Sequence, residues 1–127
     1  MKTVYSGSIW EKQVSYCRAK KAGNLVFVSG TTASNEKGEV VGDDVYLQSK
    51  YIFEKIKKAL NECGCDFKDV VRTRTFISDI TKFDLFAKAH HEVFEGIDPT
   101  ATCVEITRLV NDKLLIEIEV DAVLMAT

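Results

Sequence analysis

Hydrophobic and polar positions alternate regularly near the end of the chain, between residues 114 and 124. Successive side chains of an extended strand point to opposite faces, so this segment has one apolar face and one face with three carboxylates. We therefore predict a strand whose acidic side is either solvated or paired. The apolar face consists of Leu114, Ile116, Ile118, Val120, Ala122 and Leu124, and the other face of Leu115, Glu117, Glu119, Asp121 and Val123.

The same kind of pattern predicts four more strands. Residues 14–22 alternate, with a basic outer side, and end at the turn signal Gly23-Asn24. Residues 25–30 form a short apolar run that indicates a largely buried strand. Residues 70–77 are rich in β-branched side chains, which favour strands. The stretch 99–124 contains two strands, the second being the one described above.

Two segments show helical periodicity instead. Residues 44–63 carry an apolar stripe at spacings of three and four, with Asp43 or Asp44 as the N-cap and Gly64 as the C-cap. This stripe contains Val45, Ile52, Ile56, Ala59, Leu60 and Cys63, with Ser49 in a gap.

The second helix is expected from about residue 82 to residue 95 and ends at Gly96. Thr81 and Asp84 resemble a capping box at its start, with Asp in place of the usual Glu. Its apolar stripe contains Phe86, Ala89, His90, Val93 and Phe94.

The element order is therefore β-β-α-β-α-β-β, an α/β (α+β) mixed sheet with two helices on one face. The other face is left to solvent or to a partner. Arg72 and Arg74 lie on one of its strands, and Glu117, Glu119 and Asp121 lie on another. Opposite charges on strands of one sheet favour cross-strand pairing, and the charged face suggests an oligomer.

Composition narrows the class of protein. With 127 residues, 46% of them hydrophobic, we expect a single domain over 1–127. The start of the chain lacks an apolar run typical of a signal peptide, and no stretch is long enough for a membrane span, so we expect a cytoplasmic protein without membrane contacts. A net charge of -2 with scattered Lys and Arg makes a nucleic-acid partner unlikely on physical grounds.

Neither cysteines nor histidines predict a metal site, and we expect no cofactor. Cys63 and Cys65 are separated by one residue, which is the wrong spacing for a redox or zinc motif. The only histidines, His90 and His91, are neighbours on a predicted helix and point about 100° apart. We expect free thiols, because no secretion signal indicates an oxidising compartment.

Four sequence segments, in order and at compatible spacing, resemble motifs of the YjgF/RidA family, also known as endoribonuclease L-PSP. They are GNLVFVSG (23–30), DVVRTRTFISDITKFD (69–84), CVEITRL (103–109) and IEIE (116–119). The resemblance covers roughly residues 16–124. It implies a chorismate-mutase-like fold that assembles as a homotrimer, with three small-metabolite pockets between subunits.

The resemblance also implies a set of site residues. Glu117 matches the family's catalytic glutamate if one residue is inserted in the loop 110–115, and this glutamate orients water for attack on an imine carbon in deaminating members. The substrate-binding positions that the resemblance implies are Tyr16, Ser29, Gly30, Ala101, Thr102 and Cys103. The residue-based interpretation of Cys103 is a small buried hydrophobe rather than a nucleophile.

Two positions depart from the family pattern. Deaminating members carry a substrate-clamping arginine where this chain has Ala101, and an asparagine where it has Lys88. Arg74 or Arg18 is a candidate replacement cation, although structural pairing with a carboxylate is the favoured interpretation for each. Trp10-Glu11 forms either a pocket lid or part of a docked N-terminal arm.

These patterns support one leading hypothesis, a RidA-like trimer that hydrolyses a C–N bond, as an imine or enamine deaminase does, but that is not a typical 2-aminoacrylate deaminase. The alternative is a ligand-binding or chaperone-like trimer without catalysis, which the missing arginine favours and Glu117 disfavours. A ribonuclease is the weakest hypothesis, because the chain has no basic groove.

Overall fold

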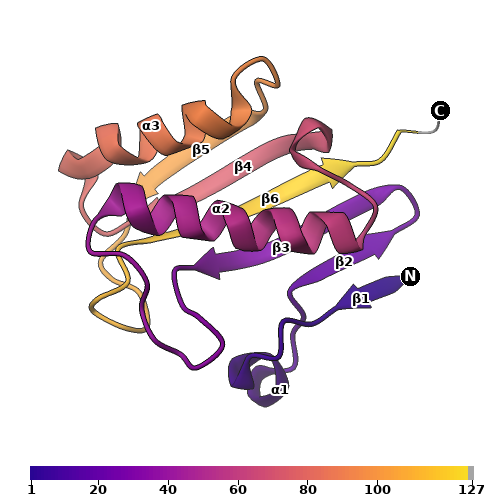
Figure 1. Cartoon of the computed structure of the whole chain (residues 1–127), viewed down its shortest axis with the longest axis horizontal. Helices are drawn as coiled ribbons and strands as arrows, with labels where there is room; N and C mark the ends of the chain where they lie inside the picture. Colours follow the sequence, from indigo (N-terminus) through magenta and orange to yellow (C-terminus); the bar gives the residue numbers. More distant parts are fainter. Residues whose placement is uncertain (126–127) are drawn as a thin grey trace.

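The alternating segment near the end of the chain forms β6, the strand at the centre of a six-stranded sheet (Figure 1). The structure is a computed structural model that describes residues 1–125. Its elements are β1 (Lys2–Val4), α1 (Ile9–Val14), β2 (Ala19–Ala22), β3 (Leu25–Thr32), α2 (Val45–Glu62), the short 3-10 turn η1 (Phe67–Asp69), β4 (Val70–Ile77), the 3-10 turn η2 (Ile80–Lys82), α3 (Phe83–Phe94), β5 (Thr100–Glu105) and β6 (Ile116–Val123).

The strands lie in the order β1-β2-β3-β6-β4-β5. Only β4 and β5 run parallel, joined by α3 as a crossover, and the other neighbours are antiparallel. The long helices α2 and α3 both lie on one face of this sheet (Figure 1). The predicted mixed α+β architecture is therefore confirmed, with one strand and one helix more than the sequence indicated.

The helices form where the apolar stripes predicted them. Asp44 caps α2, because its carboxylate accepts a hydrogen bond of 2.8 Å from the Leu47 amide. Gly64 follows the helix with φ 82°, a left-handed value that glycine adopts without steric cost. The apolar stripe of α2 is buried against the sheet together with the inner face of β6, so the core has the composition that the periodicity indicated.

The predicted cap of α3 is wrong. Its N-cap, Lys82, makes no side-chain hydrogen bond, and the Thr81–Asp84 pattern does not close. Instead Asp79 caps the preceding turn η2, accepting a bond of 3.0 Å from the Thr81 amide. The 3-10 turn therefore places the capping residue, Asp79, two residues before the expected Thr81.

The strand predicted over 14–22 is also wrong in its first half. Residues 9–14 form α1, which Ser8 caps through a 3.2 Å bond from the Trp10 amide. Ser15, in the left-handed conformation with φ 71°, ends this helix, and the strand β2 begins only at residue 19. A six-residue helix is too short for its periodicity to stand out from strand alternation.

The face of the sheet opposite the helices carries the predicted ion pairs. Arg74 lies 3.0 Å from Glu119 and 3.5 Å from Asp121, and Arg72 lies 3.8 Å from Asp121. Large apolar side chains, including Phe27 at 46% exposure, accompany these charges on the same face. Cross-strand pairing is thus confirmed. Within residues 1–125, no helix is long and apolar enough to cross a membrane.

Candidate functional site

Glu117 is the acidic residue of β6 that does not join these ion pairs. In the register it lies opposite Thr32 of β3, next to an irregularity in β3 between Val28 and Thr31. Its carboxylate lies directly over Gly30, so close that a Cβ atom there would be 2.6 Å from Oε2. Because Gly30 has no side chain, it leaves room for this carboxylate.

The pKa of Glu117 is raised above the ordinary value of a glutamate. Burial of the half-exposed carboxylate is the main cause, and the nearby Arg18 guanidinium partly opposes it. The negative charge of Glu119 adds a smaller upward effect. A carboxylate with a raised pKa is a stronger base than a solvated one, which is the property that a general base needs.

The carboxylate opens onto a cavity of about 530 Å³. This cavity lies among the N-terminal segment, the end of β3, one side of α2 and the loop before β6. Its volume suits a small metabolite. The wall that surrounds Glu117 includes Tyr16, Arg18, Gly30, Lys55 and Leu114.

Arg18 is held in this wall by backbone pairing. Its amide donates to the Val4 carbonyl at 2.8 Å, and its own carbonyl accepts from the Ser29 amide at 3.0 Å. The guanidinium is buried, with the residue 8% exposed, and Nη2 donates to the Gly30 carbonyl at 2.7 Å. It lies 5.8 Å from the centre of the Tyr16 ring, and its Nε has no partner among the described residues.

Lys55 is a second cation in the same wall. It extends from α2, and its Nζ donates to the carbonyls of Thr32 at 2.7 Å and Ser34 at 2.8 Å. The pKa of Lys55 is lowered to about 8, mainly by burial and to a smaller extent by the positive charge of Arg18. The weaker influence of Glu11 acts in the opposite direction.

Gln48 fixes the loop that leads into β6. This buried amide donates to the carbonyls of Gly42 at 3.1 Å and Lys113 at 2.9 Å, and accepts from the Leu115 amide at 2.9 Å. Because both of its groups are satisfied, the loop residues 113–115 are held in one position. The backbone of β6 is therefore held in place just before Glu117, whose side chain lines the cavity.

The N-terminal segment is docked on the sheet, since β1 pairs with β2. Glu11 is 3% exposed and accepts hydrogen bonds from the Ser6 amide at 2.9 Å and from the Ser6 hydroxyl. Trp10 lines the cavity and is 55% exposed. The structure thus shows a docked arm, and the alternative that Trp10 acts as a pocket lid stays a prediction.

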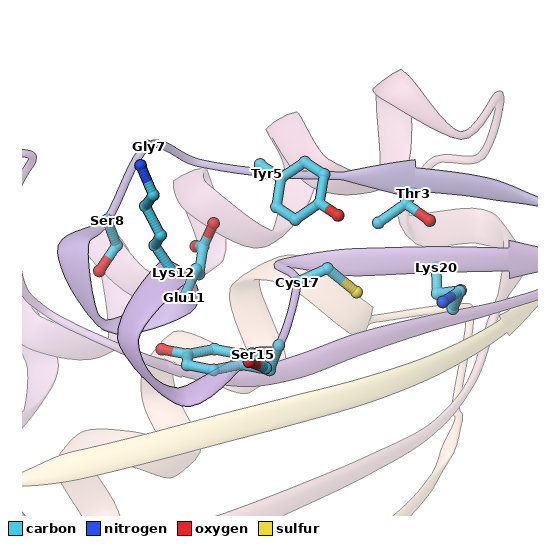
Figure 2. A pocket seen from close by; sticks show the side chains of 10 residues that line it. Thr3, Tyr5, Gly7, Ser8, Glu11, Lys12, Ser15, Cys17 and Lys20 are labelled. Atoms are coloured by element: carbon cyan, nitrogen blue, oxygen red, sulfur yellow. The ribbon is translucent and has the colours of Figure 1, made fainter.

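A second hollow of about 630 Å³ lies beside the first, along the same N-terminal segment (Figure 2). Figure 2 shows Tyr5 just beyond β1, Cys17 and Lys20 on the neighbouring segment and Glu11 on α1. Tyr16 contributes to both hollows. The second hollow is open to solvent.

The other residues predicted for the site do not line the Glu117 cavity. Ser29 donates its hydroxyl to the Cys17 carbonyl at 2.8 Å, and Arg74 is engaged in the ion pairs of the open face. Lys88 extends from α3 over the ring of Tyr46, 4.7 Å from its centre. Each of these three side chains therefore makes its contact within the protomer.

Ala101, Thr102 and Cys103 lie on β5, the strand at the far edge of the sheet. They line a separate cavity of about 640 Å³, together with aromatic side chains of α3 and with His90. Burial raises the pKa of the Cys103 thiol, as expected for an unreactive cysteine. Within one protomer, the predicted site is thus divided into two parts, one at Glu117 on the central strand β6 and one on the edge strand β5.

Sequence reasoning missed Lys55 and Gln48. The available signal was position: both lie next to the apolar stripe of α2, since Lys55 is three residues after Ile52 and four before Ala59. A polar side chain at such a boundary position is placed to bond the backbone beneath it. Within residues 1–125, no group of three His, Cys, Asp or Glu side chains is placed to hold a metal ion.

Comparison with known proteins identifies the class to which this fold and site correspond. The Endoribonuclease L-PSP family matches residues 9–124, which is nearly the whole chain. The chain therefore belongs to this family, also named YjgF/RidA.

Three relatives illustrate the match. A crystal structure from Mycobacterium tuberculosis, of a member of the YjgF/YER057c/UK114 family, is 39% identical, with a TM-score of 0.90 and coverage of 97% of this chain and 98% of that one. An uncharacterized protein of Streptomyces coelicolor is 34% identical over 96% of this chain and 91% of its own length. The 3-aminoacrylate deaminase RutC of Acinetobacter baylyi is 34% identical over 81% of this chain and 82% of its own length.

Proposed function

We propose that this protein is a homotrimeric hydrolase of the deaminase type, which cleaves a C–N bond of a small imine or enamine. The observation that carries this proposal is the state of Glu117. Its half-buried carboxylate lies over Gly30 in a cavity of about 530 Å³, has a raised pKa, and has no ion-pair partner within 4.0 Å among the described residues. Such a group is free to accept a proton.

The reaction uses Glu117 as a proton carrier. The carboxylate accepts a proton from water while the water oxygen forms a bond with the imine carbon. Glu117 then returns this proton to the nitrogen, which gives a carbinolamine. Transfer of the hydroxyl proton to the nitrogen, again through Glu117, breaks the C–N bond, so ammonia leaves and the carbon becomes a carbonyl. An enamine enters the same sequence as its imine tautomer. Base assistance of this kind contributes typically about 10²–10⁴-fold to the rate.

The division of the predicted site supports a trimer with sites between protomers. Glu117 lies on the central strand β6 and Ala101 on the edge strand β5, and the two line different cavities, so a neighbouring protomer is needed to bring them into one site. The open face, with its ion pairs and the exposed Phe27, supplies a surface for such contacts. The name of the RutC relative, a 3-aminoacrylate deaminase, agrees with C–N hydrolysis.

Ala101 limits the substrate range. An alanine offers no group for the substrate carboxylate at the position where the family resemblance implies a clamp. We therefore expect weak activity on 2-aminoacrylate-type imines, because one charge-assisted hydrogen bond is worth about 1.5–3 kcal/mol. The same alanine favours a second candidate function, a ligand-binding trimer without turnover.

Glu117→Gln tests the proposal, because it keeps the shape of the side chain and removes its basicity. Turnover is measured as ammonia release from a panel of freshly generated substrates, including 3-aminoacrylate and 2-aminoacrylate. We expect the variant to remain folded and trimeric while its rate falls about 10²–10⁴-fold. Wild-type activity in the variant excludes the catalytic role, and an inactive wild type on the whole panel favours the ligand-binding function.

A further inference from the structure

Exposed aromatic and aliphatic side chains gather around the Glu117 cavity. Tyr5, Trp10 and Val14 of the N-terminal segment are exposed, and all three line this cavity. Val110, from the loop before β6, lines it as well and is 87% exposed. Single exposed apolar side chains are common, but a group of them around one hollow indicates a binding surface.

The cavity is larger than the smallest substrates of the proposed reaction require. Cavities of about 300–1,000 Å³ hold ligands of drug size, and this one has about 530 Å³. One water molecule accounts for about 30 Å³ of liquid, and 3-aminoacrylate has the bulk of only a few waters. Such a substrate would leave most of the space beside Glu117 to solvent.

The buried charges in and around the wall are matched in number. The cations are Arg18 and Lys55, and the carboxylates are Glu117 and the buried Glu11. The charge of Arg18 acts on the pKa of Glu117, and the charge of Glu11 acts on the pKa of Lys55. The space that a small substrate leaves empty therefore requires no further charge from a ligand. The remaining charged side chains that line the cavity are exposed to solvent and are Glu36, Glu54, Lys58 and Glu62.

We propose that the Glu117 cavity accepts an aromatic, uncharged side chain of the substrate, and that Trp10 is the residue that selects it. This inference rests on the proposed function, because the ring belongs to the imine or enamine whose C–N bond lies at Glu117. A tryptophan offers a large flat surface to another ring, and aromatic pairs add affinity beyond the area that they bury. Tyr51 of α2 supplies a second ring to the same wall.

The backbone around Trp10 is already ordered. Its amide donates to the hydroxyl of Ser8, the N-cap of α1, at 3.2 Å. The next residue, Glu11, is buried and accepts from the Ser6 amide at 2.9 Å, and its carbonyl accepts from the Tyr16 amide at 3.0 Å. Binding at such a fixed platform costs less entropy than binding that must first order a loop.

The alternative is that a neighbouring protomer covers Trp10. Trp10 is the only tryptophan of the chain, so the intrinsic fluorescence of the protein reports on this one ring. If the ring waits for a ligand, acrylamide should quench its fluorescence in the intact protein, and an aromatic ligand should protect it. If a protomer covers the ring, it should be protected before any ligand is added.

Calorimetry of the intact protein with 3-phenylpropionamide and propionamide measures the preference for a ring, because the two probes differ only in the phenyl group. We expect the ring-bearing amide to bind about ten- to a hundredfold more tightly and to protect Trp10 from acrylamide. Trp10→Ala should remove about tenfold or more of its affinity, and Trp10→Phe should restore much of it. Ile9→Ala is the matched control, since Ile9 is an exposed neighbour on α1 that does not line the cavity.

Turnover gives an independent measure of the same selection. Imines are generated in the assay from phenylalanine and from alanine by an amino-acid oxidase, and kcat/KM is compared between them. Wild type should prefer the phenylalanine imine, and Trp10→Ala should lower this preference about tenfold while leaving turnover of the alanine imine unchanged. A loss that is equal for both imines would show a structural role for Trp10.

The proposal is wrong if wild type shows no preference for the ring-bearing amide, if Trp10→Ala and Ile9→Ala weaken its binding equally, or if Trp10 is protected from acrylamide without a ligand. These outcomes are distinct from a failure of the proposed function. Ring binding that depends on Trp10, without turnover of any imine, upholds the aromatic site and rejects the hydrolase. Turnover of both imines without dependence on Trp10 upholds the hydrolase and rejects the aromatic site.

Discussion

Gly30→Ala offers the sharpest test of how the site is built. Gly30 does not have the left-handed backbone that favours glycine, so alanine can adopt its conformation. The added Cβ would nevertheless lie 2.6 Å from Oε2 and 2.9 Å from Cδ of Glu117. The methyl group must therefore displace the carboxylate, which is the movable partner in this contact.

The size of the displacement follows from these distances. An ordinary contact begins at 3.4 Å, so Oε2 must move by at least 3.4 − 2.6 = 0.8 Å. A misplacement of about 1 Å in a catalytic group can cost on the order of a hundredfold in rate. Stability should change little, since replacing a glycine that has a compatible backbone gains about 0.4–1 kcal/mol from the unfolded chain. The expected result is a folded protein with about a hundredfold lower turnover.

Ammonia release and the thermal midpoint are measured for Gly30→Ala, Glu117→Ala and the double variant. Because the methyl group acts through the Glu117 carboxylate, Gly30→Ala should add no further loss of rate once Glu117 is alanine. Wild-type turnover in Gly30→Ala would refute this reasoning. So would a fully additive loss in the double variant, which would show that Gly30 acts through another group.

Three further predictions concern charge and assembly. The rate should fall as the pH drops through the raised pKa of Glu117, because protonation removes the base, so the acidic limb of the pH–rate profile should lie above that of an ordinary glutamate. The lowered pKa of Lys55 shows that the fold disfavours its charged form, so wild type should gain stability as the pH rises and Lys55 loses its proton. The unfolding free energy of wild type relative to Lys55→Met should rise by about 1–2 kcal/mol between pH 8 and 10.5, after allowance for solvent screening. Denaturant melts that show the same difference at both pH values would contradict this. Phe27→Lys should shift sedimentation from trimer toward monomer, and a wild type that is already a stable folded monomer at micromolar concentration would remove the interfacial site.

The sequence was most informative where one period extends over a long segment. Strand β4 has the predicted bounds, and α2 differs from its prediction by one residue at each end. The pattern also predicted that Arg74 pairs with a carboxylate, with Glu105, Glu117 and Glu119 as the candidates, and the structure shows Glu119 in this role. Extended periodic burial constrains the backbone strongly, so these parts could be predicted without coordinates.

Short and irregular features could not be predicted in the same way. The helix α1 has too few residues to show a period. The capping of η2 by Asp79 depends on a 3-10 turn, which no pattern in the sequence predicted. The role of Lys55 escaped for another reason. Whether a lysine beside an apolar stripe reaches solvent or a carbonyl depends on what lies beneath it, here the end of β3.

The irregularity in β3 explains why this site keeps its charges available. A regular strand would pair its carbonyls with β6, but the register shifts between Val28 and Thr31, and the carbonyl of Gly30 instead accepts from Arg18. Thr32 likewise accepts from Lys55 through its carbonyl. Backbone acceptors fix the two cations without neutralising them, whereas an ion pair would fix and neutralise at once. The same stretch supplies the glycine over which Glu117 lies. One local departure from strand geometry therefore places the Glu117 carboxylate and the two cations around the same cavity.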